Sequence, residues 1–310
     1  MGAPIVYKST DSQAPVLNGI AGSLINLLRK VLVDGYGTKP GAGWTLEFIN
    51  AAQTIAVFRN NSTVGFGKYF RVDDSIGTYA TVTGYETMAD IDNGLGRIPG
   101  GDGSSTVYYI AKSAAATTVA RPYVLIADSR EIWAVLYFNE TVLSGSSYNG
   151  GAYFLGDGVP IDALDRYCSG IIAGTTAGGT VVPMFPRGVS LANGTLSGAV
   201  LYRDYTGATK APLFSLSVPA FVYGYPGAAG FSGAINGQYQ FFRPEIIFET
   251  LTYRLHGVLP GLYYSSHLYT TFTTLQEIEV EESTLLALRV RSAANDNTQF
   301  FIDISGNFRP

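Results

Sequence analysis

The segment from Arg121 to Phe138 constrains the fold of this chain more than any other. It reads Arg-Pro-Tyr-Val-Leu-Ile-Ala-Asp-Ser-Arg-Glu-Ile-Trp-Ala-Val-Leu-Tyr-Phe. Residues 123–127 and 131–138 favour β-strands, and the polar residues 128–130 between them are few enough to form a turn. The segment therefore predicts a β-hairpin. Similar short, aromatic-rich runs between glycines and asparagines recur almost to the C-terminus.

The composition fits a β-rich scaffold with sparse charge. Hydrophobic residues make up 46% of the 310 residues, which excludes general disorder. Charged residues make up 14%, against roughly 25% in an average soluble domain. This predicts that partner subunits cover part of the surface, the alternative being a surface of uncharged Ser, Thr, Asn and Gly. The net charge of −4 argues against direct binding to nucleic acid.

The sequence shows no signal for secretion or for a membrane span. The N-terminal residues lack a basic region followed by an apolar one, so we expect no signal peptide. The longest apolar stretch, residues 19–28, contains Ser23 and Asn26, so we expect no membrane span. The single cysteine, Cys168, excludes an internal disulfide and is predicted to be a small buried residue.

One amphipathic helix is predicted near the N-terminus, at about residues 19–33. Asn18 is the expected N-cap, and Asp34 with Gly35 provides the expected stop. The helix is indicated by six apolar residues that fall on one stripe: Ile20, Leu24, Leu27, Leu28, Val31 and Leu32.

Most of the remaining chain is predicted to form strands. A rigid, irregular loop is expected at residues 35–44, a turn at residues 60–63, and a short helical turn at residues 161–167. The predicted strands are residues 45–48, 54–59, 68–72, 79–85, 107–112, 123–127, 131–138, 152–155, 196–203, 238–242, 246–255, 277–280, 284–291 and 300–304.

The fold class that follows is mainly β, with antiparallel sheets in a sandwich or barrel-like arrangement and one N-terminal amphipathic helix. The stretch from Gly170 to Gly188 is rich in Gly, Thr and Pro, which predicts a long loop or a domain boundary. We therefore expect a helix plus a β-rich domain in residues 1–185 and a second β-rich domain in residues 186–310. The alternative is a single domain.

No residue pattern points to catalysis, a metal or a cofactor. His256 and His267, the only histidines, are eleven residues apart and have no Cys or carboxylate cluster near them. A Ser–His pair and a hydrolase with a site assembled from distant residues remain open alternatives. The chain is therefore predicted not to be an enzyme, and no cofactor is expected.

Two acidic segments are interpreted as turns rather than as sites. Residues 90–94, Asp-Ile-Asp-Asn-Gly, resemble the start of a calcium loop, but the glycine comes one position early and position twelve is Gly101 instead of Glu. A polar turn is the better interpretation. Asp157, Asp162 and Asp165 surround another turn, where solvated turn chemistry is favoured over carboxylate catalysis.

Two patterns predict outward-facing side chains. Glu277, Glu279 and Glu281 alternate with apolar residues, so a strand would place all three on one face. That face is either simply solvated or an acidic strip that docks on a basic partner. In the pairs Tyr108-Tyr109 and Tyr263-Tyr264, one tyrosine of each pair should point outward.

The chain resembles a family of virion structural proteins from tailed bacteriophages. The resemblance runs across nearly the whole chain and lies in turn and strand signatures, not in chemical motifs. It is carried by Tyr7-Lys-Ser-Thr-Asp11, Gly35-Tyr-Gly-Thr-Lys-Pro-Gly-Ala-Gly-Trp44, Phe70-Arg-Val-Asp-Asp74, Gly84-Tyr-Glu86, Arg121-Pro-Tyr-Val-Leu-Ile-Ala-Asp128, Leu259-Pro-Gly-Leu-Tyr263 and Phe301-Ile-Asp-Ile-Ser-Gly306.

The resemblance implies a component of the virion, assembled in the cytoplasm of the host bacterium. It leaves open head decoration, collar, tail or baseplate, and it supplies no catalytic residues. The expected partners are other virion structural proteins and further copies of this chain in a symmetric homo-oligomer. The alternative is a module that binds the host surface or a carbohydrate, with a surface glycan as partner. The interface candidates are Tyr36, Lys39, Trp44, Met184, Phe185, Glu277, Glu279 and Glu281.

Overall fold

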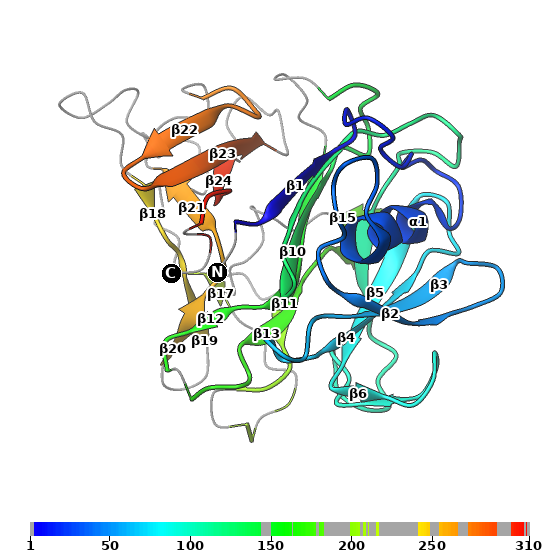
Figure 1. Cartoon of the computed structure of the whole chain (residues 1–310). Helices are drawn as coiled ribbons and strands as arrows, with labels where there is room; N and C mark the ends of the chain where they lie inside the picture. The colour runs from blue at the N-terminus through cyan, green and yellow to red at the C-terminus, as the bar shows by residue number, and fades with distance from the viewer. Residues whose placement is uncertain are drawn as a thin grey trace.

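The computed structural model confirms a mainly β chain with antiparallel sheets and one helical segment near the N-terminus. It describes residues 3–143, 150–162, 164–177, 180–182, 199–204, 207–208, 210, 215–216, 241–248, 254–265, 272–289, 299–306 and 308. The strands form three layers, with the middle sheet between an N-terminal layer and a C-terminal layer (Figure 1).

The central sheet has six strands and contains the predicted hairpin. Asp128 closes the hairpin turn, because its Oδ1 accepts hydrogen bonds from the backbone N–H groups of Arg130 at 2.7 Å and Glu131 at 3.2 Å. The strand order is β1 (Ile5–Lys8), β9 (Tyr123–Ala127), β10 (Glu131–Leu136), β11 (Gly151–Asp157), β13 (Ser169–Ile172) and β16 (Ala199–Leu201).

The N-terminal layer is a five-stranded sheet, lined on one face by the helix (Figure 1). Its order is β2 (Thr45–Ile49), β3 (Ile55–Arg59), β4 (Tyr69–Asp73), β5 (Tyr79–Tyr85) and β8 (Tyr108–Ala111). Two small hairpins accompany it, β6 (Thr87–Met88) with β7 (Gly94–Leu95), and β14 (Thr175–Ala177) with β15 (Thr180–Val182).

The C-terminal layer contains two sheets. One has the order β18 (Phe241–Phe242), β21 (Leu262–Ser265), β24 (Gln299–Asp303), β23 (Ser283–Arg289) and β22 (Glu277–Val280). The other has the order β12 (Val159–Pro160), β20 (Arg254–Val258), β19 (Glu245–Phe248) and β17 (Ser215–Leu216). The single strand predicted at residues 246–255 is therefore wrong, since two antiparallel strands occupy this part of the chain.

Alternation along the central strands divides their side chains between two cores. Leu125 and Ala134 belong to the core shared with the helix and the N-terminal sheet. Ile126 and Trp133, their neighbours along the chain, belong to the core shared with the C-terminal layer. Because successive residues of a strand point to opposite faces, a sheet between two cores must be apolar at nearly every position.

The helical segment is α1 (Ser23–Arg29), continued by a π-helical turn, η1 (Lys30–Asp34). The predicted apolar stripe is buried except at Ile20, which precedes the helix. The helical segment ends before Gly35, as predicted, but Gly35 has a φ of 81° and a ψ of 172° and is not in the left-handed helical conformation expected of this stop. Its N–H donates to the Lys30 carbonyl at 2.8 Å.

The predicted N-cap is wrong, because the cap comes from a distant loop. The Asn18 carbonyl accepts from the Ser23 hydroxyl at 2.8 Å, but its side-chain Oδ1 accepts from the backbone N–H of Ile20, before the helix begins. The Oδ2 of Asp74, which follows β4, accepts from the N–H of Leu24 at 2.7 Å and of Ile25 at 3.4 Å. A carboxylate at this position satisfies helix donors that have no partner within the helix.

Asp74 is also paired with Lys112, and both side chains are completely buried. The Lys112 ammonium donates to the Ile20 carbonyl at 2.7 Å and to Ser23 Oγ at 3.2 Å. Burial raises the pKa of Asp74, and the hydrogen bond from Lys112 opposes that rise. The pair fixes three chain segments to one another: the helix start, the loop after β4 and the end of β8.

Three parts of the loop predicted at residues 170–188 form strands, so the prediction of a loop is wrong for those parts. Residues 170–172 lie in β13, and residues 175–177 and 180–182 form β14 and β15. Gly170 is needed for close packing, since a Cβ there would lie 2.2 Å from the Val200 carbonyl oxygen in β16. Residues 183–188 lie outside the described residues.

Two further predictions concern this middle part of the chain. The predicted helical turn at 161–167 is wrong for its described residues, which are not helical. Strand β16 follows the predicted domain boundary at residue 185 and pairs with β13 before it. The central sheet therefore includes residues from both predicted domains, and the boundary stays a prediction.

We predict that Lys112→Met destabilises the fold by about 3–5 kcal/mol, because the Asp74 carboxylate stays buried without its ammonium partner. The double variant Asp74→Asn with Lys112→Met should recover much of this loss. Urea denaturation measures both effects. The matched control is Lys30→Met, which removes the exposed pair with Asp34 and should cost less than about 1 kcal/mol. A Lys112→Met variant as stable as the wild type would contradict the role of the pair.

We also predict that Leu28→Asp prevents soluble folding. Leu28 is buried on the apolar stripe of α1, and an unpaired buried carboxylate costs several kcal/mol. Asn26→Asp on the exposed side of the same helix is the control and should fold. Circular dichroism and the soluble yield of the two variants distinguish these outcomes. A folded Leu28→Asp protein would show that the stripe is not essential to the core.

Candidate interaction surface

The outer face of the N-terminal sheet carries tyrosines and arginines. Along β4, Phe70 and Val72 point into the core, whereas Tyr69, Arg71 and Asp73 lie half-buried on the opposite face. The half-buried side chains of this face include Arg59 on β3, Tyr69, Arg71 and Asp73 on β4, Tyr79 and Thr81 on β5, and Tyr109 on β8. Val57, Thr83, Tyr85 and Ala111 lie on the same face but are buried.

The predicted alternation of the tyrosine pairs is confirmed. Tyr108 is buried and Tyr109 is half-buried on the outer face. In β21, Tyr264 is buried and Tyr263 is half-buried. In each pair, one tyrosine therefore faces the core and the other lies on the opposite face of its sheet.

Ring contacts hold several of the outer-face side chains in place. The guanidinium carbon of Arg59 lies 4.8 Å from the ring centroid of Tyr69, within the range of a cation–π contact. The rings of Tyr79 and Tyr109 meet edge to face, with centroids 5.4 Å apart. These contacts restrict side chains that would otherwise lose conformational entropy on binding a partner.

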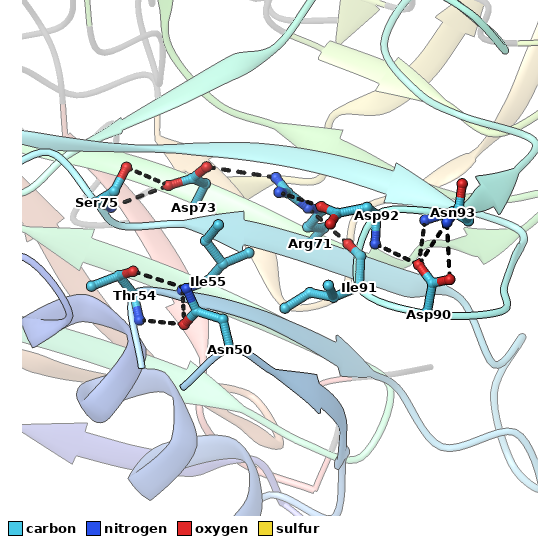
Figure 2. A network of polar contacts seen from close by, with 10 residues as sticks. All are labelled: Asn50, Thr54, Ile55, Arg71, Asp73, Ser75, Asp90, Ile91, Asp92 and Asn93. Carbon is cyan, nitrogen blue, oxygen red and sulfur yellow. Dashed lines mark hydrogen bonds and ion pairs between the residues drawn. The ribbon is translucent and has the colours of Figure 1, made fainter. Parts of the chain in front are cut away.

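Arg71 connects this face to the tip of the β6–β7 hairpin (Figure 2). Its Nε donates to the Ile91 carbonyl at 2.9 Å, and its Nη2 lies 3.2 Å from Asp92 Oδ1. A second carboxylate, on Asp73, lies 3.7 Å from Nη1. Sequence reasoning missed this residue, because Arg71 and Asp92 are twenty-one positions apart and share no motif.

The hairpin tip is the polar turn that the sequence predicted. Asp90 Oδ1 accepts from the backbone N–H groups of Asp92 and Asn93, each at 2.9 Å (Figure 2). The side-chain amide of Asn93 also donates to Asp90, and these hydrogen bonds lower the pKa of the Asp90 carboxyl. All of these bonds lie within the turn, which explains its shape without a bound ion.

Two of the interface candidates make contacts within the chain, at the free edge of β1. Lys39 Nζ donates to the Val6 carbonyl and to Asp11 Oδ2, both at 2.6 Å. The buried Tyr36 donates its hydroxyl to the same carboxylate oxygen at 2.8 Å. The hydrogen bonds and the Lys39 ammonium hold the pKa of Asp11 below its usual value, despite its partial burial.

Of the other interface candidates, Trp44 is buried inside the chain. Its Nε1 donates to the Asp128 carbonyl at 2.9 Å in the hairpin of the central sheet. Tyr36 and Trp44 therefore offer little side-chain surface to another subunit, and a contact at Lys39 stays a prediction. Met184 and Phe185 lie outside the described residues.

Glu277 and Glu279 lie on β22, the outermost strand of its sheet, whereas Glu281 follows the strand in a turn and has a φ of 52°. All three glutamates are exposed, and Ile278 and Val280 between them are half-buried. The predicted alternation along one strand holds for Glu277 and Glu279 but not for Glu281, which lies beyond the strand. Thr284 donates its hydroxyl to the Glu279 carboxylate at 3.1 Å. Charged side chains on an edge strand discourage pairing with strands of other chains, which is the simplest role for this strip.

The described histidine, His256, is a buried residue of β20. Its Nε2 lies 3.1 Å from Asp165 Oδ2, and burial lowers the pKa of His256 to about 4. Cys168 is buried in the second core, as predicted, and His267 lies outside the described residues. Within the described ranges, no three or more His, Cys, Asp or Glu side chains are arranged to hold a metal ion.

The interpretation of the three aspartates as solvated turn residues is wrong for two of them. Asp162 is exposed and caps its own turn, but Asp157 and Asp165 are buried. Asp157 accepts from the Asn60 side-chain amide and from the Phe66 N–H, both at 2.8 Å. It therefore ties the central sheet to the turn between β3 and β4.

No family model matches the chain, and no curated protein matches it significantly. In the part of the chain that the structure describes, none of the helices is both long and apolar enough to span a membrane.

We predict that acid weakens the fold through His256. In the folded chain the His256 imidazole takes up a proton with a pKa of about 4, against 6.5 for an ordinary histidine. The free energy of unfolding should therefore fall as the pH drops from about 6.5 to 4, because the unfolded chain binds this proton more tightly. The loss is at most about 3 kcal/mol. The raised pKa of Asp165 opposes it, because the folded chain takes up that proton more readily than the unfolded chain.

Denaturation of the wild type and of His256→Gln across this pH range isolates the histidine. The variant should be less stable at neutral pH and should show a smaller loss on acidification. Equal pH slopes for the two proteins would show that His256 does not control acid stability.

Proposed function

We propose that this chain is a non-enzymatic structural subunit of a tailed-bacteriophage virion, whose work is to contact other subunits of the particle. The outer face of the N-terminal sheet carries the proposal. Tyr and Arg are enriched at protein interfaces and among the residues that contribute most to binding. Here they stand on a regular sheet, next to a hairpin that Arg71 holds in place.

The three-layer scaffold suits such a role, because it supports the face from behind. The inner side of the same sheet packs on the core shared with the helix and the central sheet. Asp74 and Lys112 fix this layer at one end, and Asp157 ties it to the central sheet. A rigid face loses little entropy on association, and one face can serve every copy in a symmetric assembly.

The proposed partners are other virion structural proteins and further copies of the chain, assembled in the host cytoplasm. The net charge of −4 fits protein partners better than nucleic acid. The resemblance of short stretches along nearly the whole chain to virion proteins supports the same class. The position in the particle, whether head, collar, tail or baseplate, is open in this proposal.

A second candidate, binding of a host-surface glycan, is favoured by one part of the same face. Tyr109 pairs with Thr81 across β8 and β5, Thr81 pairs with Asp73, and the ring of Tyr79 lies against that of Tyr109. An aromatic ring beside hydroxyl and carboxylate groups can stack on a sugar and bind its hydroxyls. The same residues would then bind a glycan in place of a subunit.

The variant Tyr79→Ala with Tyr109→Ala tests both candidates. If the face contacts subunits, the double variant should fold normally but enter particles at least about tenfold less than wild type, a loss of about 1.4 kcal/mol or more. Quantitative mass spectrometry of purified particles measures incorporation. Leu164→Ala, which removes an exposed apolar side chain outside this sheet, is the control and should be incorporated normally.

Two other results would change the assignment. If the double variant is incorporated fully but its particles no longer bind host cells, the face is a glycan site. If wild-type protein is not present in purified particles at a constant copy number, the chain is not a virion subunit.

A further inference from the structure

Four large apolar side chains are exposed together near the start of α1. The exposed fractions are 55% for Val16, 43% for Ile20, 43% for Ile76 and 46% for Val119. They belong to three loops: residues 16–22 before the helix, residues 74–77 after β4, and residues 114–121 after β8. We call the exposed residues of these loops the three-loop patch.

Hydrogen bonds show that the three loops are neighbours. Gly19 donates its N–H to the Thr117 carbonyl at 2.8 Å, and Arg121 donates its N–H to the Leu17 carbonyl at 2.7 Å. Gly22 donates its N–H to the Asp74 carbonyl at 3.0 Å. The backbones of the three loops therefore lie side by side, and the four exposed apolar side chains lie on these adjoining loops.

Gly19 lies where the loops meet most closely. A Cβ at this position would lie 2.0 Å from the Ala115 carbonyl oxygen and 2.6 Å from the Thr117 nitrogen, so only glycine fits. A Cβ on Gly77 would likewise lie 2.4 Å from the Gly19 carbonyl oxygen. The backbones thus pack directly against each other, and the patch is formed before any partner arrives.

The patch has no exposed charge of its own. The only ionisable residues in the three loops are Asp74 and Arg121, and both are buried. Asp74 is paired with Lys112, and Arg121 donates to Ser113 Oγ and to the Glu140 carbonyl. Residues 114–120, Ala-Ala-Ala-Thr-Thr-Val-Ala, are all exposed and uncharged.

We propose that the three-loop patch is a second contact surface, separate from the outer sheet face, through which two copies of this chain associate. An exposed apolar patch of this kind is typical of an interaction site. Because it is uncharged, it can meet its own copy without opposing like charges, whereas the acidic edge of β22 would repel its copy. A strongly charged partner would lose hydration here and gain no ion pair. The proposal does not depend on the virion assignment or on the outer sheet face.

Sedimentation equilibrium of the purified full-length chain over a range of concentrations tests the proposal. The wild type should self-associate reversibly. Ile76→Lys and Val119→Lys should each weaken association at least about tenfold, since the two copies would bring ammonium groups together in an apolar contact. Val64→Lys and Leu95→Lys are matched controls, because both residues are exposed and lie outside the three loops. Thermal denaturation verifies that all four variants fold.

A cross-link gives an independent measurement. The native Cys168 is buried and should not react on oxidation. Val119→Cys should then form a disulfide-linked dimer, whereas Val64→Cys, which lies outside the three-loop patch, should not. A wild type that is monomeric at every concentration overturns the proposal. So does self-association that Ile76→Lys and Val119→Lys leave unchanged, or that the control variants weaken equally.

Discussion

The architecture depends on a central sheet that is buried on both faces. Alternate residues of β9 and β10 serve two different cores, so each strand stabilises the N-terminal and the C-terminal layer at once. Hydrogen bonds reinforce both sides. Trp133 Nε1 donates to the Pro260 carbonyl at 2.9 Å, and the Tyr153 hydroxyl accepts from the Ala111 N–H at 2.9 Å. A polar change in these strands would therefore damage two cores, not one.

Local patterns identified most of the elements, because their causes are local. The hairpin around Asp128 and the apolar stripe of α1 are visible over fewer than twenty residues. The helix cap was missed for the opposite reason, since Asp74 lies about fifty positions from Leu24. The Gly- and Thr-rich residues after Gly170 suggested a loop, but β-branched neighbours and a close approach to β16 make them strands.

On the surfaces too, local patterns were predictable from the sequence, whereas contacts between distant residues were not. Alternation predicted that one tyrosine of the pair Tyr108-Tyr109 would face outward. The contact of Arg71 with Asp92 depends on how the β6–β7 hairpin folds back, which no spacing encodes. Trp44, the last residue of the irregular loop at residues 35–44, was expected at an interface. In the folded chain its indole fills a space beside the central hairpin. The uncharged run of residues 114–120 was a usable signal for the three-loop patch, because it lacks both strand periodicity and charge.

The pairing of β1 with β9 has a consequence for folding during synthesis. Residues 5–8 hydrogen-bond with residues 124–127, so the first strand has no partner until about 120 more residues have been made. At about 5–20 residues per second, the ribosome needs roughly 6–25 s to deliver them. Contacts of such large sequence separation also form slowly. The N-terminal layer thus reaches its final packing only after the central hairpin has emerged, and the apolar side of α1 is available to chaperones until then.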